Sequence, residues 1–269
     1  MRLEHKTAII MGGGQAPGAS EAIGNGRATA ILFAREGAKV CCVDRHLNSA
    51  QETADMIAKE GGTAMATAAD VTDEAAVEAA IKQCAAAWGR VDILHNNVGV
   101  SVEGGDAPLD KVSTEAFERI FDINLLGTML ACKHALPLMR AQKAGAIVNI
   151  SSASAYWTGH PTVLYPASKM AMVSFTRQLA IQNADAGVRA NVILPGLMDT
   201  PMAVDRRVEA TGRTRDDIAG ERDSKVPLLN KMGTGWDVAH AALFLASDDA
   251  GFITGVELPV DGGSLARVG

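Results

Sequence analysis

The strongest constraint on the fold is a regular alternation of short apolar runs with longer helical patterns. We expect seven strands, at residues 6–11, 38–43, 63–69, 91–95, 146–151, 188–194 and 256–260. Helical spacing of apolar residues occupies most of the stretches between them, at residues 26–35, 46–60, 73–88, 113–143 and 164–183. Because parallel strands need crossover helices, this order predicts a doubly wound α/β fold with one seven-stranded, mostly parallel sheet and helices on both faces.

Length and composition favour a single domain built on this sheet. The chain has 269 residues, of which 48% are hydrophobic and 21% charged, enough for one large core. No linker, repeat or low-complexity tract divides the sequence, so we expect one domain over residues 1–269. A charged and irregular stretch at about residues 198–232 follows the sixth strand, and we expect it to cover the cleft as a lid.

Charge and cysteine usage restrict the partners. The formal net charge of −6 argues against nucleic acid or an anionic membrane and indicates a small-molecule partner. The sequence shows no secretory signal pattern and no apolar run long enough for a bilayer span, which predicts a cytoplasmic protein without a membrane partner. Because the cysteines lack metal-ligand spacing, we expect buried free thiols and no metal at Cys41, Cys42, Cys84 and Cys132.

A glycine-rich stretch follows the first apolar run, with residues 12–26 reading GGGQAPGASEAIGNG. Glycines here let the backbone approach a pyrophosphate, whose charge then lies at the N-terminus of the next helix. Asp44 ends the next apolar run, at the spacing of a carboxylate that binds the adenosine-ribose hydroxyls and repels a 2′-phosphate. Arg45 could instead pair with that phosphate, but the aspartate favours NAD as the cofactor.

The stretch from Ser152 to Lys169, SASAYWTGHPTVLYPASK, outlines a proton-transfer site. On a helix, Tyr165 and Lys169 lie one turn apart on the same face, with Ser152 facing them from the preceding strand. A free phenol titrates at about pH 10, so we expect the ammonium of Lys169 to lower the pKa of Tyr165 while Ser152 binds a substrate oxygen. A tyrosine and a lysine at this spacing also occur on ordinary helix surfaces, so the assignment depends on the rest of the chain.

Taken together, the motifs resemble those of the classical short-chain dehydrogenase/reductase family over essentially the whole chain. Their order and spacing are more specific than any one motif. They are GNG at 24–26, Asp44, Asp70 with Val71, NNVG at 96–99, Asn124 in DINLLGT, Ser152 thirteen residues before Tyr165, YPASK at 165–169, Pro195 with Gly196 and Thr200, and DGG at 261–263.

The resemblance implies a Rossmann-type domain with a catalytic tetrad of Asn124, Ser152, Tyr165 and Lys169. Tyr165 would exchange the proton with the substrate, Lys169 would also hold the nicotinamide ribose, and Asn124 would anchor a water that relays the proton. The resemblance further implies a homotetramer formed through the long helices and the C-terminal strands. The implied cofactor-binding residues are Gly12, Gly24, Asn25, Gly26, Asp44, Arg45, Asp70, Val71, Asn97, Gly99, Pro195, Gly196 and Thr200.

The expected activity is that of an NAD-dependent oxidoreductase that interconverts a secondary alcohol and a ketone, with Tyr165 as general acid/base. Trp157 before Tyr165, and Met198, Met202 and Val204 on the inner face of the lid, suggest an apolar or ring-bearing substrate. Two alternatives stay open. The first is an enoyl-type double-bond reductase of the same superfamily, which also enlarges the glycine loop but spaces its tyrosine and lysine further apart. The second is a non-catalytic dinucleotide-sensing protein.

Overall fold

The computed structural model describes residues 1–15 and 20–267, and its centre is a seven-stranded sheet in the order β3-β2-β1-β4-β5-β6-β9. Every neighbouring pair in this sheet is parallel. The predicted seven strands and doubly wound fold are therefore confirmed. The strands are β1 (Thr7–Met11), β2 (Lys39–Asp44), β3 (Thr63–Ala68), β4 (Ile93–Asn96), β5 (Gly145–Ile150), β6 (Val188–Pro195) and β9 (Glu257–Val260).

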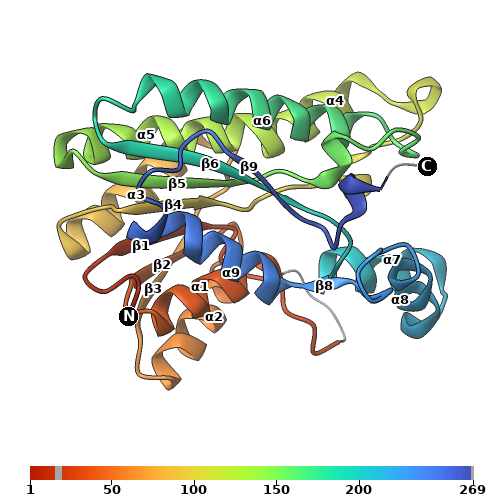
Figure 1. Cartoon of the computed structure of the whole chain (residues 1–269), viewed down its shortest axis with the longest axis horizontal. Helices are drawn as coiled ribbons and strands as arrows, with labels where there is room; N and C mark the ends of the chain where they lie inside the picture. Colours follow the sequence, from red (N-terminus) through yellow and green to blue (C-terminus); the bar gives the residue numbers. More distant parts are fainter. Residues whose placement is uncertain (16–19, 268–269) are drawn as a thin grey trace.

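Helices cover both faces of the sheet. In Figure 1, α4, α5 and α6 lie above the sheet, and α1, α2 and α9 lie below it. None of the helices in the described ranges is long and apolar enough to cross a bilayer. The helices are α1 (Asn25–Arg35), α2 (Leu47–Lys59), α3 (Glu74–Trp88), α4 (Thr114–Phe121), α5 (Gly127–Gln142), α6 (Leu164–Gln182), α7 (Arg206–Thr211), α8 (Arg215–Asp223) and α9 (Gly235–Ala246).

The strands read as unbroken apolar runs because both of their faces are buried. Successive side chains of a strand point to opposite faces, so Ile10 and Cys42 pack against α1 and α9, whereas Ile9 and Cys41 pack with α3 and α5. The four cysteines are buried and free, as expected.

The long helical region expected at residues 113–143 contains a wider turn. Between α4 and α5 lies one π-helical turn, η3 (Asp122–Leu126). Such turns carry one residue more than an α-helical turn and re-aim the side chains beside them. Asn124 sits in this turn with its side chain fully buried, toward the start of α6.

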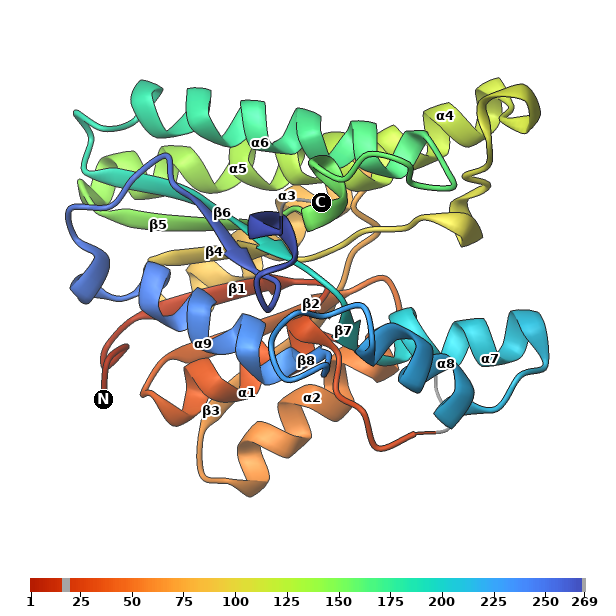
Figure 2. The same ribbon diagram turned by 45° about the vertical axis from the view of Figure 1, so that its right-hand side comes forward.

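The expectation that residues 198–232 are irregular is wrong, because they contain regular structure, whereas their role as a lid stays a prediction. The short strand β7 (Met198–Asp199) pairs with β8 (Gly233–Thr234), and a π-helical turn, η5 (Pro201–Asp205), leads into α7 and then α8. Thr200 and Thr214 cap η5 and α8 by accepting backbone N–H bonds. These helices are short and mostly charged, so their apolar periodicity is weak. Figure 2 shows α7 and α8 as a separate projection beside the carboxyl ends of the strands.

Candidate active site

The candidate site lies at the carboxyl ends of the strands. The chain builds the sheet outward from β1 to β3 in one direction and from β4 to β9 in the other. The reversal at the β1–β4 pair opens a crevice at the carboxyl edge, where ligands of doubly wound sheets bind. The glycine-rich stretch after β1, Asp44 at the end of β2, Asn97 after β4 and Ser152 after β5 all reach this edge.

The structure brings Tyr165 and Lys169 together in the first two turns of α6. The Nζ atom of Lys169 lies 5.7 Å from the centre of the Tyr165 ring. This lysine is only 2% exposed, and its Nζ donates a hydrogen bond of 2.9 Å to the carbonyl oxygen of Ile150, at the end of β5. Ser152 stands two residues further on, with its Oγ accepting from the backbone N–H of Ser154 at 3.1 Å. The three side chains thus share one end of the cleft.

Burial controls the protonation of this pair. It raises the pKa of the Tyr165 phenol above its ordinary value, and a hydrogen bond with Ser152 opposes this only in part. Burial also lowers the pKa of the Lys169 ammonium to about 8. The expectation that Lys169 lowers the pKa of Tyr165 is therefore wrong for this structure. Loss of water around the phenol is the largest cause, and the Lys169 ammonium is directed toward the Ile150 carbonyl.

Asn124 connects three parts of the site through its side-chain amide. Its Oδ1 accepts from the backbone N–H of Val100 at 2.8 Å, and its Nδ2 donates to the Val100 carbonyl and to Ser168 Oγ, both at 3.0 Å. A Cβ added at Gly99 would lie 3.1 Å from Lys169 Nζ and 3.5 Å from Asn124 Oδ1. The glycine therefore keeps a space free between the lysine and the asparagine.

The glycine-rich stretch packs backbone against backbone at the start of α1. A Cβ at Gly26 would lie 2.0 Å from the carbonyl oxygen of Gly12, and one at Gly14 would lie 2.6 Å from Asp44 Oδ2. Gly24 precedes α1 and has no side chain to cap it, so the first N–H groups of the helix can bind an anion. Asn25 Oδ1 is buried without a hydrogen-bond partner among the described residues. The bare glycine backbone and the uncapped helix N-terminus fit the pyrophosphate of a dinucleotide, whereas the Asn25 oxygen, an acceptor, suits a donor group.

The enlargement of this stretch is held by residues that the sequence motifs did not reveal. Gln15 Oε1 accepts from the backbone N–H of Gly24 at 2.8 Å, and the backbone N–H of Gln15 donates to Ser49 Oγ at 2.7 Å. Ser20 Oγ donates to Asp205 Oδ2 in the lid at 2.6 Å. Residues 16–19 of the stretch lie outside the described residues. The enlarged turn thus bonds to both α2 and the lid.

Comparison with known proteins decides the family. A family model described as enoyl-(acyl carrier protein) reductase matches residues 18–264. The chain is 37% identical to the uncharacterized oxidoreductase YxbG of Bacillus subtilis, over 98% of this chain and 93% of that protein. The chain belongs to the short-chain dehydrogenase/reductase family. As a member it is an oxidoreductase with a nicotinamide dinucleotide cofactor.

Two further relatives of this short-chain dehydrogenase/reductase support the assignment. The chain is 36% identical to the 7alpha-hydroxysteroid dehydrogenase of Clostridium sardiniense, over 97% of this chain and 94% of that one. The crystal structure of levodione reductase superposes with a TM-score of 0.91 at 31% identity, covering 99% of this chain and 100% of the other.

The residues expected beside the adenosine end of the cofactor gather at the ends of β2 and β3. Asp44 Oδ1 accepts from the backbone N–H of His46 at 3.0 Å, and the side chain of Arg45 is exposed beside it. Asp70 accepts from the backbone and side chain of Thr72, which lowers the pKa of its carboxyl, with a further contribution from Arg45. Val71 packs against α5, because a Cβ added at Gly127 would lie 2.7 Å from the Cβ of Val71.

The residues expected beside the nicotinamide end lie at or after the carboxyl ends of β4 and β6. Asn97 Nδ2 donates to the Gly12 carbonyl at 3.3 Å. Pro195 ends β6, and a Cβ at Gly196 would lie 2.7 Å from the Cα of Asp261, so this turn passes close to the last strand. Thr200 is buried, and its Oγ1 accepts from the backbone N–H of Ala203 at 3.3 Å.

The expected inner face of the lid is only partly present. Met202 is 37% exposed, but Val204 is fully buried in a small apolar cluster inside the lid, and Met198 is buried in the main core. The apolar residue Val204 packs among the helices of the lid itself. The sequence pattern could not distinguish such a residue from one that lines the cleft. Arg206 of α7 pairs with Glu103 of the short helix η1 (Val102–Gly104).

Proposed function

We propose that the protein is an NAD-dependent dehydrogenase/reductase that interconverts a secondary alcohol and a ketone, with Tyr165 as general acid/base. One observation carries the proposal. A tyrosine and a buried lysine share one face of α6, with the lysine Nζ 5.7 Å from the ring, next to a serine and a glycine-rich dinucleotide crevice. Such a site can exchange a proton with an oxygen while hydride moves to or from the adjoining carbon.

The bound nicotinamide supplies the hydride chemistry, and the protein handles the proton. Because burial raises the pKa of Tyr165, the phenol is protonated at neutral pH and can donate to the oxygen of a ketone. Alcohol oxidation needs the phenolate. Ser152 orients the substrate oxygen, and Lys169 holds the nicotinamide ribose through the space beside Gly99.

Asn124 anchors a water on the path by which the proton leaves. Its amide already joins Val100 to Ser168, which supports a fixed position for this side chain beside the lysine. The buried, bridging amide differs from a helix-interior asparagine that bonds to its own backbone.

NAD is the cofactor we propose, on the charge of Asp44. Its carboxylate ends β2 and suits two ribose hydroxyls, whereas a 2′-phosphate would lie beside a like charge. Arg45 is exposed next to it, and its positive charge favours a 2′-phosphate instead. Steady-state kinetics with NAD and NADP test the choice, and a higher kcat/KM with NADP would contradict it.

The substrate we propose is apolar or ring-bearing. Met202 is exposed and Trp157 is partly buried, in the two segments expected to line the cleft, and one relative is named for a hydroxysteroid and another for levodione. A panel of cyclic, aryl and hydroxy-acid alcohols with NAD, followed at the absorbance of the reduced nicotinamide, identifies the class.

Reduction of an activated double bond is the second candidate, favoured by the description of the matching family model and by the enlarged glycine-rich turn. Tyr165 and Lys169 stand four residues apart, which favours carbonyl chemistry. Oxidation of secondary alcohols with NAD, without reduction of an enoyl thioester, would separate the two.

Replacing Tyr165 by Phe tests the mechanism. The substitution keeps the ring and removes only the hydroxyl, so kcat should fall by about 10²–10⁴-fold. The Kd for NAD, measured by tryptophan fluorescence, should stay within about twofold, because the phenol hydroxyl is assigned to the substrate. Turnover at the wild-type rate would show that the proposed function is wrong.

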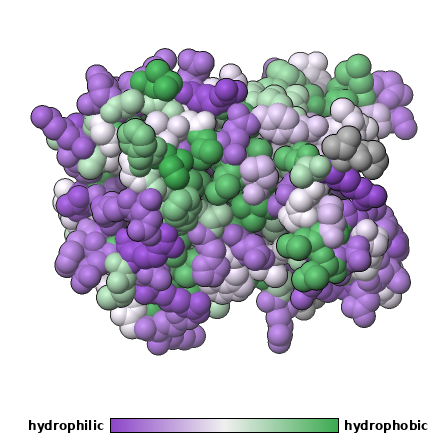
Figure 3. All heavy atoms as spheres, viewed as in Figure 1, coloured by the Kyte–Doolittle hydropathy of each residue, from purple (hydrophilic) through white to green (hydrophobic). Residues whose placement is uncertain are grey.

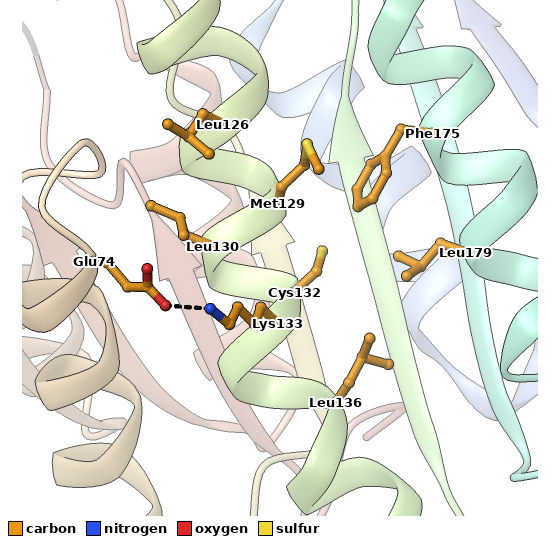
Figure 4. A pocket seen from close by; sticks show the side chains of 9 residues that line it. All are labelled: Glu74, Leu126, Met129, Leu130, Cys132, Lys133, Leu136, Phe175 and Leu179. Atoms are coloured by element: carbon orange, nitrogen blue, oxygen red, sulfur yellow. Dashed lines mark hydrogen bonds and ion pairs between the residues drawn. The ribbon is translucent and has the colours of Figure 1, made fainter.

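We also propose a homotetramer. Apolar side chains of α5 and α6 line an open groove on the outer face, bordered by the ion pair between Lys133 and Glu74 (Figure 4). Leu126 and Met129 are well exposed there, as expected of a helix pair that packs on a second copy. Hydrophobic residues also gather across the middle of the face in Figure 3, over β6 and β9, where a second contact would form. Light scattering should give about four times the 28.0 kDa of one chain.

A further inference from the structure

We propose that Asp106 is a positioning residue that fixes the backbone of Tyr165 for proton transfer. The inference rests on the proposed function and adds a residue to it. Asp106 follows η1 in the loop after β4, and it belongs to none of the sequence motifs of the site.

The carboxylate of Asp106 binds the first residues of α6 directly. It is 5% exposed and lies 59 residues before the tyrosine. Its Oδ2 accepts from the backbone N–H of Tyr165 at 2.9 Å, and its Oδ1 accepts from the backbone N–H of Leu164 at 2.9 Å. Thr162 Oγ1 also donates to Oδ2, at 2.6 Å. Each of the two oxygens thus holds a different part of the turn that carries the tyrosine.

This arrangement replaces a missing local cap. The residue before α6 is Val163, whose apolar side chain cannot accept a hydrogen bond from the helix. The first N–H groups of any helix need acceptors from outside it, and a negative charge at this end is favourable. Asp106 supplies the acceptors and the negative charge from a loop that is distant in the sequence. The start of α6 is therefore fixed relative to that loop as well as to its own chain neighbours.

The same loop contacts the lid. Glu103, three residues before Asp106, pairs with Arg206 of α7. Between them the loop lies tightly on α4, since a Cβ at Gly104 would be 2.9 Å from Ile120 and one at Gly105 would be 2.9 Å from Ala116. The position of the tyrosine is thus tied to the wall of the substrate cleft. A shift of about 1 Å in a reacting group can cost about a hundredfold in rate.

Asp92 provides a matched control at the opposite end of the sheet. It is also 5% exposed, and its Oδ2 accepts from the backbone N–H of Thr7 at 2.8 Å. Arg90 binds the same carboxylate through two hydrogen bonds of 2.7 and 2.6 Å. Asp92 therefore shares the burial and the backbone contact of Asp106 but lies away from the cleft. Replacing it reports the cost of losing a buried carboxylate alone.

The experiment compares Asp106→Ala, Asp106→Asn and Asp92→Asn in the full chain, each assayed well below its own Tm. Asp106→Ala should lower kcat by about a hundredfold and leave the Kd for NAD within about twofold. The kcat of Asp106→Asn should lie between that of Asp106→Ala and that of wild type, because an amide has only one acceptor oxygen. Asp92→Asn should lower Tm by a few degrees and leave kcat within about twofold.

Two results would overturn the inference. One is wild-type kcat in a folded Asp106→Ala protein, and the other is an equal loss of kcat in Asp106→Asn and Asp92→Asn. If Asp106→Ala does not fold, the two asparagine variants decide. The Tyr165→Phe protein separates this question from the proposed function. If the Tyr165→Phe protein keeps its turnover, the catalytic assignment is refuted. If Tyr165→Phe loses turnover but Asp106→Ala keeps it, only the positioning role is refuted.

Discussion

The polar contacts at the start of α6 differ from those in residues 198–232, the proposed lid. At the start of α6, Lys169, Ser168 and Asp106 are all buried, and each makes hydrogen bonds of 2.6 to 3.0 Å. In residues 198–232, Arg215 pairs with Asp199 while both side chains are 32% exposed, and Arg213 pairs with Glu221 while their side chains are 48% and 50% exposed. Buried hydrogen bonds are strong and hold one geometry, whereas exposed ion pairs contribute little and are screened by salt.

The difference separates the chemistry from the recognition of substrate. The acid/base group must keep its place to within a fraction of an ångström, and the buried contacts provide that precision. We propose that residues 198–232 admit a substrate and close on it, which weak and exchangeable contacts allow. Variants of the buried region should therefore affect kcat, and variants of the lid should affect KM.

The largest effect is expected when Lys169 is replaced by Met, a side chain of similar length without charge. Because burial lowers the lysine pKa from 10.5 to about 8, the folded state carries a costly ammonium at neutral pH. Wild-type stability should increase as the pH rises from about 8 to 10.5, since the unfolded chain still binds the proton there. The variant should lose at least about 10²-fold in kcat and yet melt at a higher temperature at pH 7.

Calorimetry and turnover of the Lys169→Met protein between pH 7 and the alkaline limit of the assay check this pair of effects. A lower Tm than wild type at neutral pH would show that the hydrogen bond to Ile150 stabilises more than the buried charge costs. Wild-type turnover would remove Lys169 from the mechanism.

An intermediate effect is expected from pH. Because the pKa of Tyr165 is raised, the phenolate needed for alcohol oxidation is scarce at neutral pH. The kcat/KM for oxidation should therefore rise by up to about tenfold per pH unit from about pH 6 to 8, whereas ketone reduction should not increase. Initial rates in both directions at constant ionic strength measure this. A pH-independent oxidation rate would indicate that another group accepts the proton.

The smallest effect is expected in the lid, for Arg215→Ala. Removing its pairs with Asp199 and with Asp205, whose side chain is only 6% exposed, should lower the free energy of unfolding by about 1–3 kcal/mol and raise KM a few-fold at unchanged kcat. High salt should produce a similar rise in the wild-type KM. Arg35→Ala, which breaks an exposed pair with Glu60 far from the cleft, is the control for charge removal. A large loss of kcat in Arg215→Ala would show that the lid also positions the reacting groups.

The sequence predicted the sheet and the position of Tyr165 and Lys169 because both depend on local patterns. Apolar runs and helical spacing are legible over a few residues, and the tyrosine and lysine are one turn apart. Asp106 was not predictable in this way, since it meets α6 across 58 residues of sequence. The direction of the Tyr165 pKa shift was predicted wrongly, because burial is a property of the packed chain. The lid helices were missed because their charged surface hides the helical period.

The π-helical turn η3 makes the position of Asn124 depend on the number of residues between α4 and α5. It places Asn124 against Val100 and Ser168 by fitting an extra residue into one turn between α4 and α5. Deleting one residue there would restore an ordinary helical turn and leave α4 and α5 in nearly their present register, because the wider turn holds one extra residue, but it would turn Asn124 away from Val100 and Ser168. The shortened protein would gain regular backbone bonding and lose the asparagine from the cleft, so insertions and deletions in this segment should be tolerated far less than substitutions.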